Sequence, residues 1–246
     1  MQLAGRSALV TGASSGIGRE TALALSRHGV AVKATGRDPR ALAEVARAAS
    51  GAFLAADLSR DADVDRLADW AGPVDLLVNN AGVGWAGAFS TMEPSRSEEL
   101  VRVNLLAPIR LAELLLPGML ERGAGHIVNV ASIAGHVGVR HEAVYSATKA
   151  GLIVFSESLR YEVAGSGVGI TVVAPGVVDT AFFERAGRPY VRSFPRLIGV
   201  ARVARAIVRA VERNRAEVFV PRWMAVPARL RGVMPGLYRS LAARFG

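Results

Sequence analysis

The sequence predicts an α/β domain built on one doubly wound parallel sheet of about seven strands, with helices on both faces. Short β-branched runs alternate with amphipathic stretches along nearly the whole chain, a pattern typical of a covered parallel sheet. A glycine-rich turn also follows the first apolar run. Such a turn is typical of the point where the first strand of these folds leads into a helix. Strands are expected at residues 7–11, 31–35, 53–56, 76–79, 126–131, 170–174 and 218–220. Helices are expected at residues 16–28, 39–49, 61–70, 96–120, 143–164 and 200–213.

Composition narrows the class of protein. The 246 residues, 51% of them hydrophobic, suit a single domain over residues 1–246, and no linker or repeat interrupts them. The absence of cysteine excludes disulfides and Cys-ligated metals, and the four histidines lack metal-ligand spacing, so no metal is expected. We expect a cytoplasmic protein, because neither a signal-peptide pattern nor an uninterrupted apolar run of membrane-spanning length is present.

The charge of the chain is basic and uneven. The net charge is +9, and from Arg185 onward 14 arginines stand against two acidic residues. Such an excess suits nucleic acid, anionic lipid or an anionic substrate. All but two of the 30 basic residues are arginine, which equally fits an ordinary solvated surface. No nucleic-acid-binding motif is present, so nucleic acid is not an expected partner.

Residues 11–18, Thr-Gly-Ala-Ser-Ser-Gly-Ile-Gly, predict a pyrophosphate site. Gly12 permits a tight turn, Gly16 lets the backbone approach phosphates, and Gly18 lets the following helix pack closely. The helix N-terminus then offers free N–H groups and the positive end of its dipole to an anion. The alternative for this turn alone is an ordinary connection between a strand and a helix.

Tyr145 and Lys149 are four residues apart on a predicted helix and therefore share one face. An ammonium group beside a phenol stabilises the phenolate and lowers its pKa from about 10 toward neutrality. Tyr145 could then exchange protons with an alcohol or a carbonyl. A half-buried tyrosine beside an extended lysine is the alternative.

Two further polar residues follow predicted strands or interrupt predicted helices. Ser132 comes directly after the strand at 126–131 and could hold a substrate oxygen beside the phenol, or simply cap a helix. Asn104 lies four residues before Pro108, which has no N–H, so the Asn104 carbonyl loses its helical partner. That carbonyl could hold a water on a path to Lys149; a simple kink is the alternative.

In this order, these segments resemble the short-chain dehydrogenase/reductase family. The resemblance runs over roughly residues 5–220 and includes residues 11–18, Asn-Asn-Ala-Gly at 79–82, Asn104, Ser132, Tyr-Ser-Ala-Thr-Lys at 145–149, and Pro175-Gly176. It implies a Rossmann-type domain, hydride transfer with NAD(H) or NADP(H), and a homodimer or homotetramer.

The resemblance also implies roles for single residues. Tyr145 would be the acid–base residue, Ser132 would orient the substrate oxygen, and Lys149 would bind the nicotinamide ribose and tune Tyr145. Asn104 would hold a relay water. The residues expected to bind the cofactor are Gly12, Ser14, Ser15, Gly16, Ile17, Gly18, Arg37, Asp57, Leu58, Asn80, Ala81, Gly82, Tyr145, Lys149, Pro175, Gly176 and Val178.

The residues after the second predicted strand favour NADP(H). An acid at this point normally holds the ribose 2′-hydroxyl of NAD, but here the position is Gly36. Arg37 follows and can pair with a 2′-phosphate. Asp38 precedes Pro39 and is better interpreted as a helix cap. Residue 15 in the glycine-rich turn is serine, so the turn itself supplies no second positive charge for the 2′-phosphate.

The same resemblance implies that residues 178–200 close over substrate, and we call this segment the lid. They contain Phe182, Phe183, Tyr190, Phe194 and Leu197, and Trp85, Met92 and Val137 are expected to line the same pocket. An apolar pocket suits a lipophilic ketone or secondary alcohol. The alternative is that these side chains belong to the core or to a subunit interface.

Residues 222–246 form a basic extension with five arginines and no acid. Apolar residues recur at helical spacing around Pro235, namely Leu230, Val233, Leu237, Leu241 and Phe245. Such a helix could make peripheral contact with an anionic membrane, or pack on the substrate mouth or a partner subunit.

The sequence thus predicts an NADP(H)-dependent oxidoreductase that interconverts a small lipophilic carbonyl compound and its alcohol. Two alternatives remain open: a ketoacyl reductase that takes its substrate from an acyl carrier, and a non-catalytic NADPH-binding regulator. The complete set of Asn104, Ser132, Tyr145 and Lys149 argues against the regulator, which needs no acid–base residue.

Overall fold

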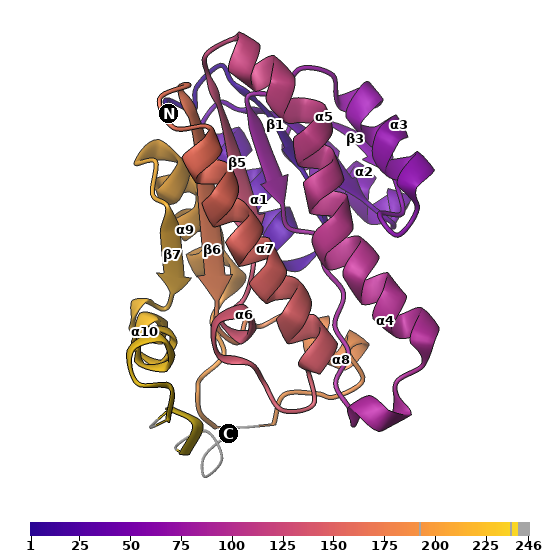
Figure 1. Cartoon of the computed structure of the whole chain (residues 1–246). Coiled ribbons are helices and arrows are strands. Elements are labelled where there is room, and N and C mark those ends of the chain that lie inside the picture. The colour runs from indigo at the N-terminus through magenta and orange to yellow at the C-terminus, as the bar shows by residue number, and fades with distance from the viewer. Residues whose placement is uncertain (192, 237, 241–246) are drawn as a thin grey trace.

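The computed structural model describes residues 1–191, 193–236 and 238–240. Within them, one sheet has the strand order β3-β2-β1-β4-β5-β6-β7, with every neighbouring pair parallel (Figure 1). The predicted doubly wound fold class is therefore confirmed. The strands are β1 Ser7–Val10, β2 Ala31–Gly36, β3 Ala52–Ala55, β4 Leu76–Asn79, β5 Gly125–Val130, β6 Val168–Pro175 and β7 Glu217–Val220.

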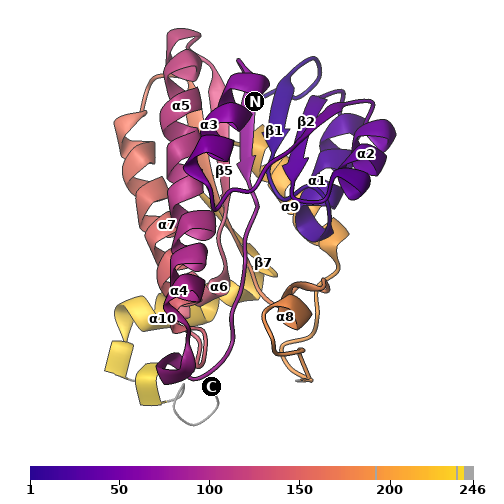
Figure 2. The same ribbon diagram turned by 90° about the vertical axis from the view of Figure 1, so that its right-hand side faces the viewer.

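Two layers of helices cover the sheet (Figure 2). One layer contains α1 (Gly16–Arg27), α2 (Pro39–Ala48) and α9 (Val200–Glu212). The other contains α3 (Asp61–Ala71), α5 (Ala107–Glu121) and α7 (Ala143–Glu162). Side chains of β1 alternate between the layers: Ala8 and Val10 belong to the first core and Leu9 to the second. Strands buried on both faces explain why the predicted strands read as continuous apolar runs.

Shorter helices gather near the carboxyl ends of the strands. They are α4 (Pro94–Val101), α6 (Ile133–Val137), α8 (Phe182–Arg185) and α10 (Ala225–Val233). Figure 1 shows α6, α8 and α10 grouped below the sheet, at the end to which the strand arrows point.

The single helix expected at 96–120 is the main departure from prediction. The structure instead has α4, a π-helical turn at Arg102–Leu106, and α5. Because Pro108 has no N–H, the regular ladder is broken there, and the N–H of Ala107 donates to the carbonyl of Arg102, five residues back. The irregularity near Asn104, for which a simple kink was one of the two interpretations, is a π turn.

The combined helical segment Pro94–Glu121 is long and apolar enough, by length and composition, to cross a membrane. Because its apolar residues are interrupted by polar ones, the search for uninterrupted apolar runs did not identify this segment. In the structure its buried side, including Leu111 and Met119, belongs to the core beneath α3 and α7. Arg110 on its outer side pairs with Asp65 of α3 at 2.9 Å. These contacts are those of a core helix of the domain.

The C-terminal extension folds back on the domain. α10 packs against α6, where Arg231 donates to the carbonyl of His136. The Tyr238 hydroxyl donates to the carbonyl of Val137 at 3.2 Å. α10 ends at Val233, before Pro235, as the sequence predicts. The expected apolar positions Leu237, Leu241 and Phe245 lie outside the described residues.

Candidate active site

A cavity of about 1010 Å³ opens at the carboxyl ends of the strands. It lies across the point where the strand order reverses between β1 and β4, which is where ligands bind in such sheets. All but one of the residues expected to bind the cofactor line this cavity; Gly18 is the exception. The sequence therefore located the cavity correctly, although binding by each residue stays a prediction.

The glycine turn after β1 fits closely against the end of β4. Gly12 has φ +65°, and a Cβ there would lie 2.8 Å from the Cα of Ala81. A Cβ on Gly18 would lie 2.2 Å from the carbonyl oxygen of Gly12, so Gly18 packs α1 against the turn rather than facing the cavity. The N-cap Ser15 makes no side-chain cap bond, and the first turn of α1 has no acid. This N-terminus fits a pyrophosphate.

Thr11 was part of the motif but was not predicted as a site residue. Its buried hydroxyl accepts the N–H groups of Asn80 (2.9 Å) and Ala81 (3.0 Å). The Asn80 amide in turn donates to the carbonyl of Thr11 at 2.9 Å. The phosphate turn and the end of β4 are thereby fixed to each other, and the threonine that opens the motif was the available signal.

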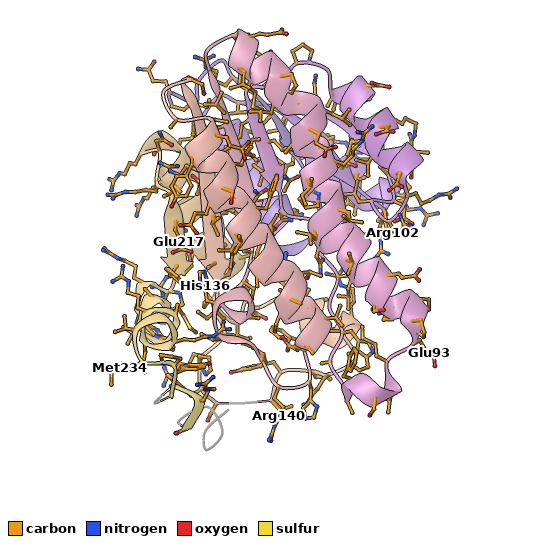
Figure 3. All side chains as sticks on the ribbon, viewed as in Figure 1. Glu93, Arg102, His136, Arg140, Glu217 and Met234 are labelled. Carbon is orange, nitrogen blue, oxygen red and sulfur yellow. The ribbon has the colours of Figure 1, made fainter. Side chains whose placement is uncertain are left out.

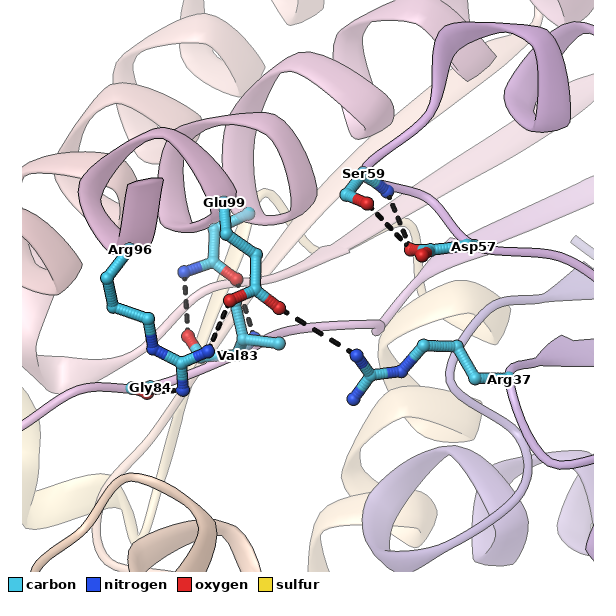
Figure 4. A network of polar contacts seen from close by, with 8 residues as sticks. Arg37, Asp57, Ser59, Val83, Gly84, Arg96 and Glu99 are labelled. Atoms are coloured by element: carbon cyan, nitrogen blue, oxygen red, sulfur yellow. Dashed lines mark hydrogen bonds and ion pairs between the residues drawn. The ribbon is translucent and has the colours of Figure 1, made fainter. Parts of the chain in front are cut away.

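At the far end of the cavity, Arg37 and Glu99 face each other across the opening (Figure 4). Arg37 Nη1 lies 3.8 Å from Glu99 Oε1. Arg96 holds the other oxygen of Glu99 and donates to the carbonyl of Gly84 at 3.2 Å. Arg96 and Glu99 were not among the predicted site residues. Their opposite charges three residues apart could be recognised in the sequence, but the sequence does not show that this face of α4 lines the cavity.

Two aspartates near this end have distinct roles. Asp38 caps α2 by accepting the N–H groups of Arg40 (2.9 Å) and Ala41 (3.1 Å), which confirms the cap interpretation. Asp57 lines the cavity, and its Oδ1 accepts both the N–H and the hydroxyl of Ser59 (Figure 4). Asp57 was expected to bind the cofactor, and its place on the cavity wall is compatible with that prediction.

Tyr145 and Lys149 share one face of α7, as predicted, and both line the cavity while being largely buried. The Lys149 ammonium nitrogen lies 5.9 Å from the centre of the Tyr145 ring and donates to the carbonyl of Val130 at 2.9 Å. Ser132 caps a helix and lies beside the phenol, whereas its role in holding a substrate oxygen stays a prediction. It is the N-cap of α6, accepting the N–H of Ala134 at 3.1 Å, and its hydroxyl also hydrogen-bonds the phenol.

The pKa values of this pair correct one prediction. Burial raises the pKa of the Tyr145 phenol above its ordinary value, the Ser132 hydrogen bond lowers it, and Glu142 raises it further. Burial also lowers the pKa of Lys149 to about 8. The pKa of the phenol is thus raised where a lowered value was expected, because desolvation of the phenolate outweighs the Ser132 hydrogen bond.

Asn104 lies behind the cavity rather than in it. Its amide forms a paired contact with Val83, accepting that residue's N–H and donating to its carbonyl, both at 2.9 Å. It also donates to the Thr148 hydroxyl at 3.3 Å. The side chain thus fixes the strand-end segment against α7, and the expected water on the Asn104 carbonyl stays a prediction.

The apolar wall of the cavity differs in part from expectation. Phe182, Phe183, Tyr190 and Val137 line it as predicted. Four other expected residues do not, and each has another position. Trp85 and Met92 pack on the cluster of Leu100 and Tyr145, Phe194 stacks on Trp223 with ring centres 5.5 Å apart, and Leu197 is exposed. Trp223, Met224, Pro227 and Tyr238 of the extension complete the wall.

This geometry agrees with comparisons to known proteins. The family model for short chain dehydrogenases matches residues 6–190. This chain belongs to the short-chain dehydrogenase/reductase family. It is accordingly an oxidoreductase acting on CH–OH and C=O groups. Members of this family bind a nicotinamide dinucleotide, and the turn at Gly12 and the N-terminus of α1 fit its pyrophosphate.

Individual relatives span almost the whole chain. The ketoacyl reductase HetN of Nostoc sp. is 39% identical over 230 residues, covering 89% of this chain and 79% of that protein. A short-chain dehydrogenase of Sphingobium yanoikuyae, solved in complex with NADPH, is 30% identical with a TM-score of 0.82, covering 94% of this chain and 95% of its own. A relative from Burkholderia phymatum, solved with NAD, has 27% identity and a TM-score of 0.87, covering 96% of each chain.

Proposed function

We propose that this dehydrogenase/reductase interconverts a lipophilic carbonyl compound and its secondary alcohol with NADP(H). The observation that carries the proposal is the meeting of Tyr145, Ser132 and Lys149 beside the glycine turn, in one cavity with an aromatic wall. A regulator that only senses NADPH would not need this acid–base arrangement. Turnover of any substrate with NADPH would exclude the regulator.

The preference for NADP(H) is argued from the end of β2. Gly36 offers no carboxylate to a ribose 2′-hydroxyl, and Arg37 follows it on the wall of the cavity. The Arg37 side chain is 63% exposed and its ion pair with Glu99 is long, so its guanidinium can turn toward a 2′-phosphate. Similar structures hold NADPH or NAD, so the argument for NADP(H) rests on the residues at the end of β2. The test is kcat/KM for NADPH against NADH with one substrate.

The nicotinamide ring, when bound, supplies hydride to the carbonyl carbon or accepts it from the alcohol carbon. During reduction the Ser132 hydroxyl holds the carbonyl oxygen, and Tyr145 gives that oxygen its proton. General acid catalysis of this kind contributes about 10²–10⁴-fold to the rate. The resulting phenolate is stabilised by the Ser132 hydrogen bond and by the buried ammonium of Lys149. Lys149, with a pKa lowered to about 8, can return a proton to the phenol near neutral pH.

The substrate class is argued from the cavity wall. Phe182, Phe183 and Tyr190 from the lid meet Trp223 and Met224 from the extension around one space. Removing apolar substrate surface from water favours binding by about 25 cal/mol per Å². We therefore expect kcat/KM to rise with the apolar size of a ketone series, measured as NADPH consumption. A flat series would contradict the lipophilic assignment.

A ketoacyl reductase is the second candidate, and the similarity to HetN favours it. One experiment separates the two. The same β-ketoacyl group is offered as a free ester, as a thioester of a small thiol, and as a thioester of an acidic carrier protein. A kcat/KM that is high only for the carrier-bound form assigns the ketoacyl activity, whereas equal use of free ketones supports the first proposal. The expected homodimer or homotetramer is tested by light scattering of the same preparation.

A further inference from the structure

A second hollow, of about 750 Å³, lies along the β7 edge of the sheet and is separate from the catalytic residues. We call it the arginine groove. It runs between α9, β7 and α10. Its arginines are Arg202, Arg205 and Arg209 from α9, Arg213 and Arg215 directly after α9, and Arg222 and Arg229 from the extension. All seven side chains are exposed. The acid in the groove is Glu217, and its Oε1 lies 2.9 Å from His136 Nε2 (Figure 3).

The α9 arginines form a stripe of like charge. Positions 202, 205 and 209, with Arg213 at the C-cap, follow the three- and four-residue spacing that places side chains on one face of a helix. Like charges at this spacing destabilise a helix. Among the described residues, arginines that pair with a carboxylate occur from Arg6 to Arg110, and none lines the groove. The groove therefore carries a positive field that an external anion would neutralise.

The extension separates the groove from the active-site cavity. Arg222 and Arg229 face the groove, whereas Trp223, Met224 and Pro227 face the cavity. The face of α10 that carries Arg229 also exposes Val226 and Val233, which stand three and four residues from it, and we call this the outer face of α10.

Val226, Val233 and Met234 are 65%, 81% and 50% exposed, and Figure 3 labels Met234 at the outer margin of α10. Phe194 and Val191 of the lid are exposed near the same mouth, at 69% and 88%. Cationic and apolar surfaces thus meet beside the opening of the cavity.

We propose that the arginine groove and the outer face of α10 dock this protein on an anionic lipid surface, with the cavity mouth next to the bilayer. Charge alone would suit nucleic acid or an acidic protein equally well. The exposed valines and Met234 favour lipid, because an interfacial helix inserts such side chains below the headgroups while its arginines contact the phosphates. The further suggestion that substrate enters from the bilayer rests on the lipophilic substrate proposed above; the docking itself does not.

The test is sedimentation of the full chain with vesicles of phosphatidylcholine, with and without phosphatidylglycerol. We expect binding to the anionic vesicles, weakened by salt because surface charges are screened. The variant Arg202→Glu/Arg209→Glu should lower the partition coefficient at least about 25-fold, since each arginine near an anionic surface contributes about fivefold. Val226→Ser/Val233→Ser should weaken binding without changing the salt dependence.

The matched control is Arg40→Glu/Arg47→Glu on α2, which changes the net charge equally at the same seven-residue spacing, on exposed side chains outside the groove. It should bind as the wild type does. Equal recovery of wild type in the supernatant with both vesicle types would overturn the proposal, as would equal loss of binding by the control. Retention by duplex DNA or polyglutamate without vesicle binding would also overturn it.

Turnover of a water-soluble ketone is measured for every variant. We expect it to be unchanged, because no groove residue touches the catalytic group. Loss of turnover in wild type would refute the proposed function and leave the vesicle result intact, so the two failures are distinguishable.

Discussion

Replacing Gly36 by Asp should shift the cofactor preference toward NAD(H), and the structure indicates that the substitution fits. A Cβ at this position would lie 3.1 Å from the hydroxyl of Ser14, a small side chain that can rotate away, and meets no backbone atom closer than that. The position is the last residue of β2 and is not among the glycines with positive φ. The new carboxylate would therefore enter the cavity between Ser14 and Arg37 without breaking the strand.

The magnitude follows from charge. Two unit charges about 5 Å apart repel by about 1–3 kcal/mol at effective dielectric constants between those of water and a protein surface. Each 1.36 kcal/mol corresponds to about a tenfold change. Since Arg37 beside the site is well exposed, we expect the lower part of this range. The ratio of kcat/KM for NADPH to that for NADH should then fall at least about fivefold, further if the carboxylate also accepts a ribose hydroxyl.

The assay is initial-rate kinetics with both cofactors at a fixed ketone concentration. Gly36→Asn is the matched control, because it adds nearly the same volume without the charge. It should lower both kcat/KM values alike and leave their ratio near that of wild type. An unchanged ratio for Gly36→Asp, or an equal shift for Gly36→Asn, would refute the electrostatic reasoning.

The remaining predictions address other parts of the site and the core. Tyr145→Phe should reduce kcat by at least about 10³-fold while fluorescence titration still detects NADPH binding; substantial residual turnover would contradict its role as the proton donor. Glu99→Gln should free Arg37 and lower the KM for NADPH by about two- to fivefold, because an exposed ion pair is worth about 1 kcal/mol or less, with the KM for NADH unchanged. Burial lowers the pKa of His126 to about 3, so the unfolded chain binds a proton between about pH 6.5 and 3 that the folded chain does not. The free energy of unfolding should therefore fall with decreasing pH in this window, by at most about 1.4 kcal/mol per unit from this residue; urea titrations of His126→Gln should lack that contribution, and identical slopes would disprove it.

Sequence patterns predicted a structural feature correctly where the contacts that produce it are between residues close in sequence. Tyr145 and Lys149 share a helix face because they are four residues apart, and the Asp38–Pro39 pair caps α2 for reasons contained in three residues. Contacts between residues on opposite sides of the cavity could not be predicted in this way. Glu99 approaches Arg37 only because α4 lies over the opening, a tertiary arrangement that periodicity does not specify.

Desolvation was also beyond the sequence pattern. The spacing of Tyr145 and Lys149 indicated proximity, from which a lowered phenol pKa seemed to follow. The sign of the shift depends on how deeply α7 is covered by the lid and by α6, and burial proved to dominate. The arginine groove shows the same limit: the excess of arginine was plain, but its gathering on one helix edge beside α10 required the fold.

The π turn at Arg102–Leu106 gives α4 a rotational register that differs from that of α5. Each residue of a regular helix advances the side-chain direction by about 100° around the helix axis. One extra residue in the π turn therefore rotates the side chains of α4 by about that angle relative to those of α5. Deleting one residue there would return the segment to the α-helical repeat, apart from the one bond that Pro108 cannot donate, and would carry Arg96 and Glu99 off the wall they now occupy. The buried half beyond the bulge would keep its place. A single insertion or deletion could in this way change which α4 side chains face Arg37 without disturbing the core.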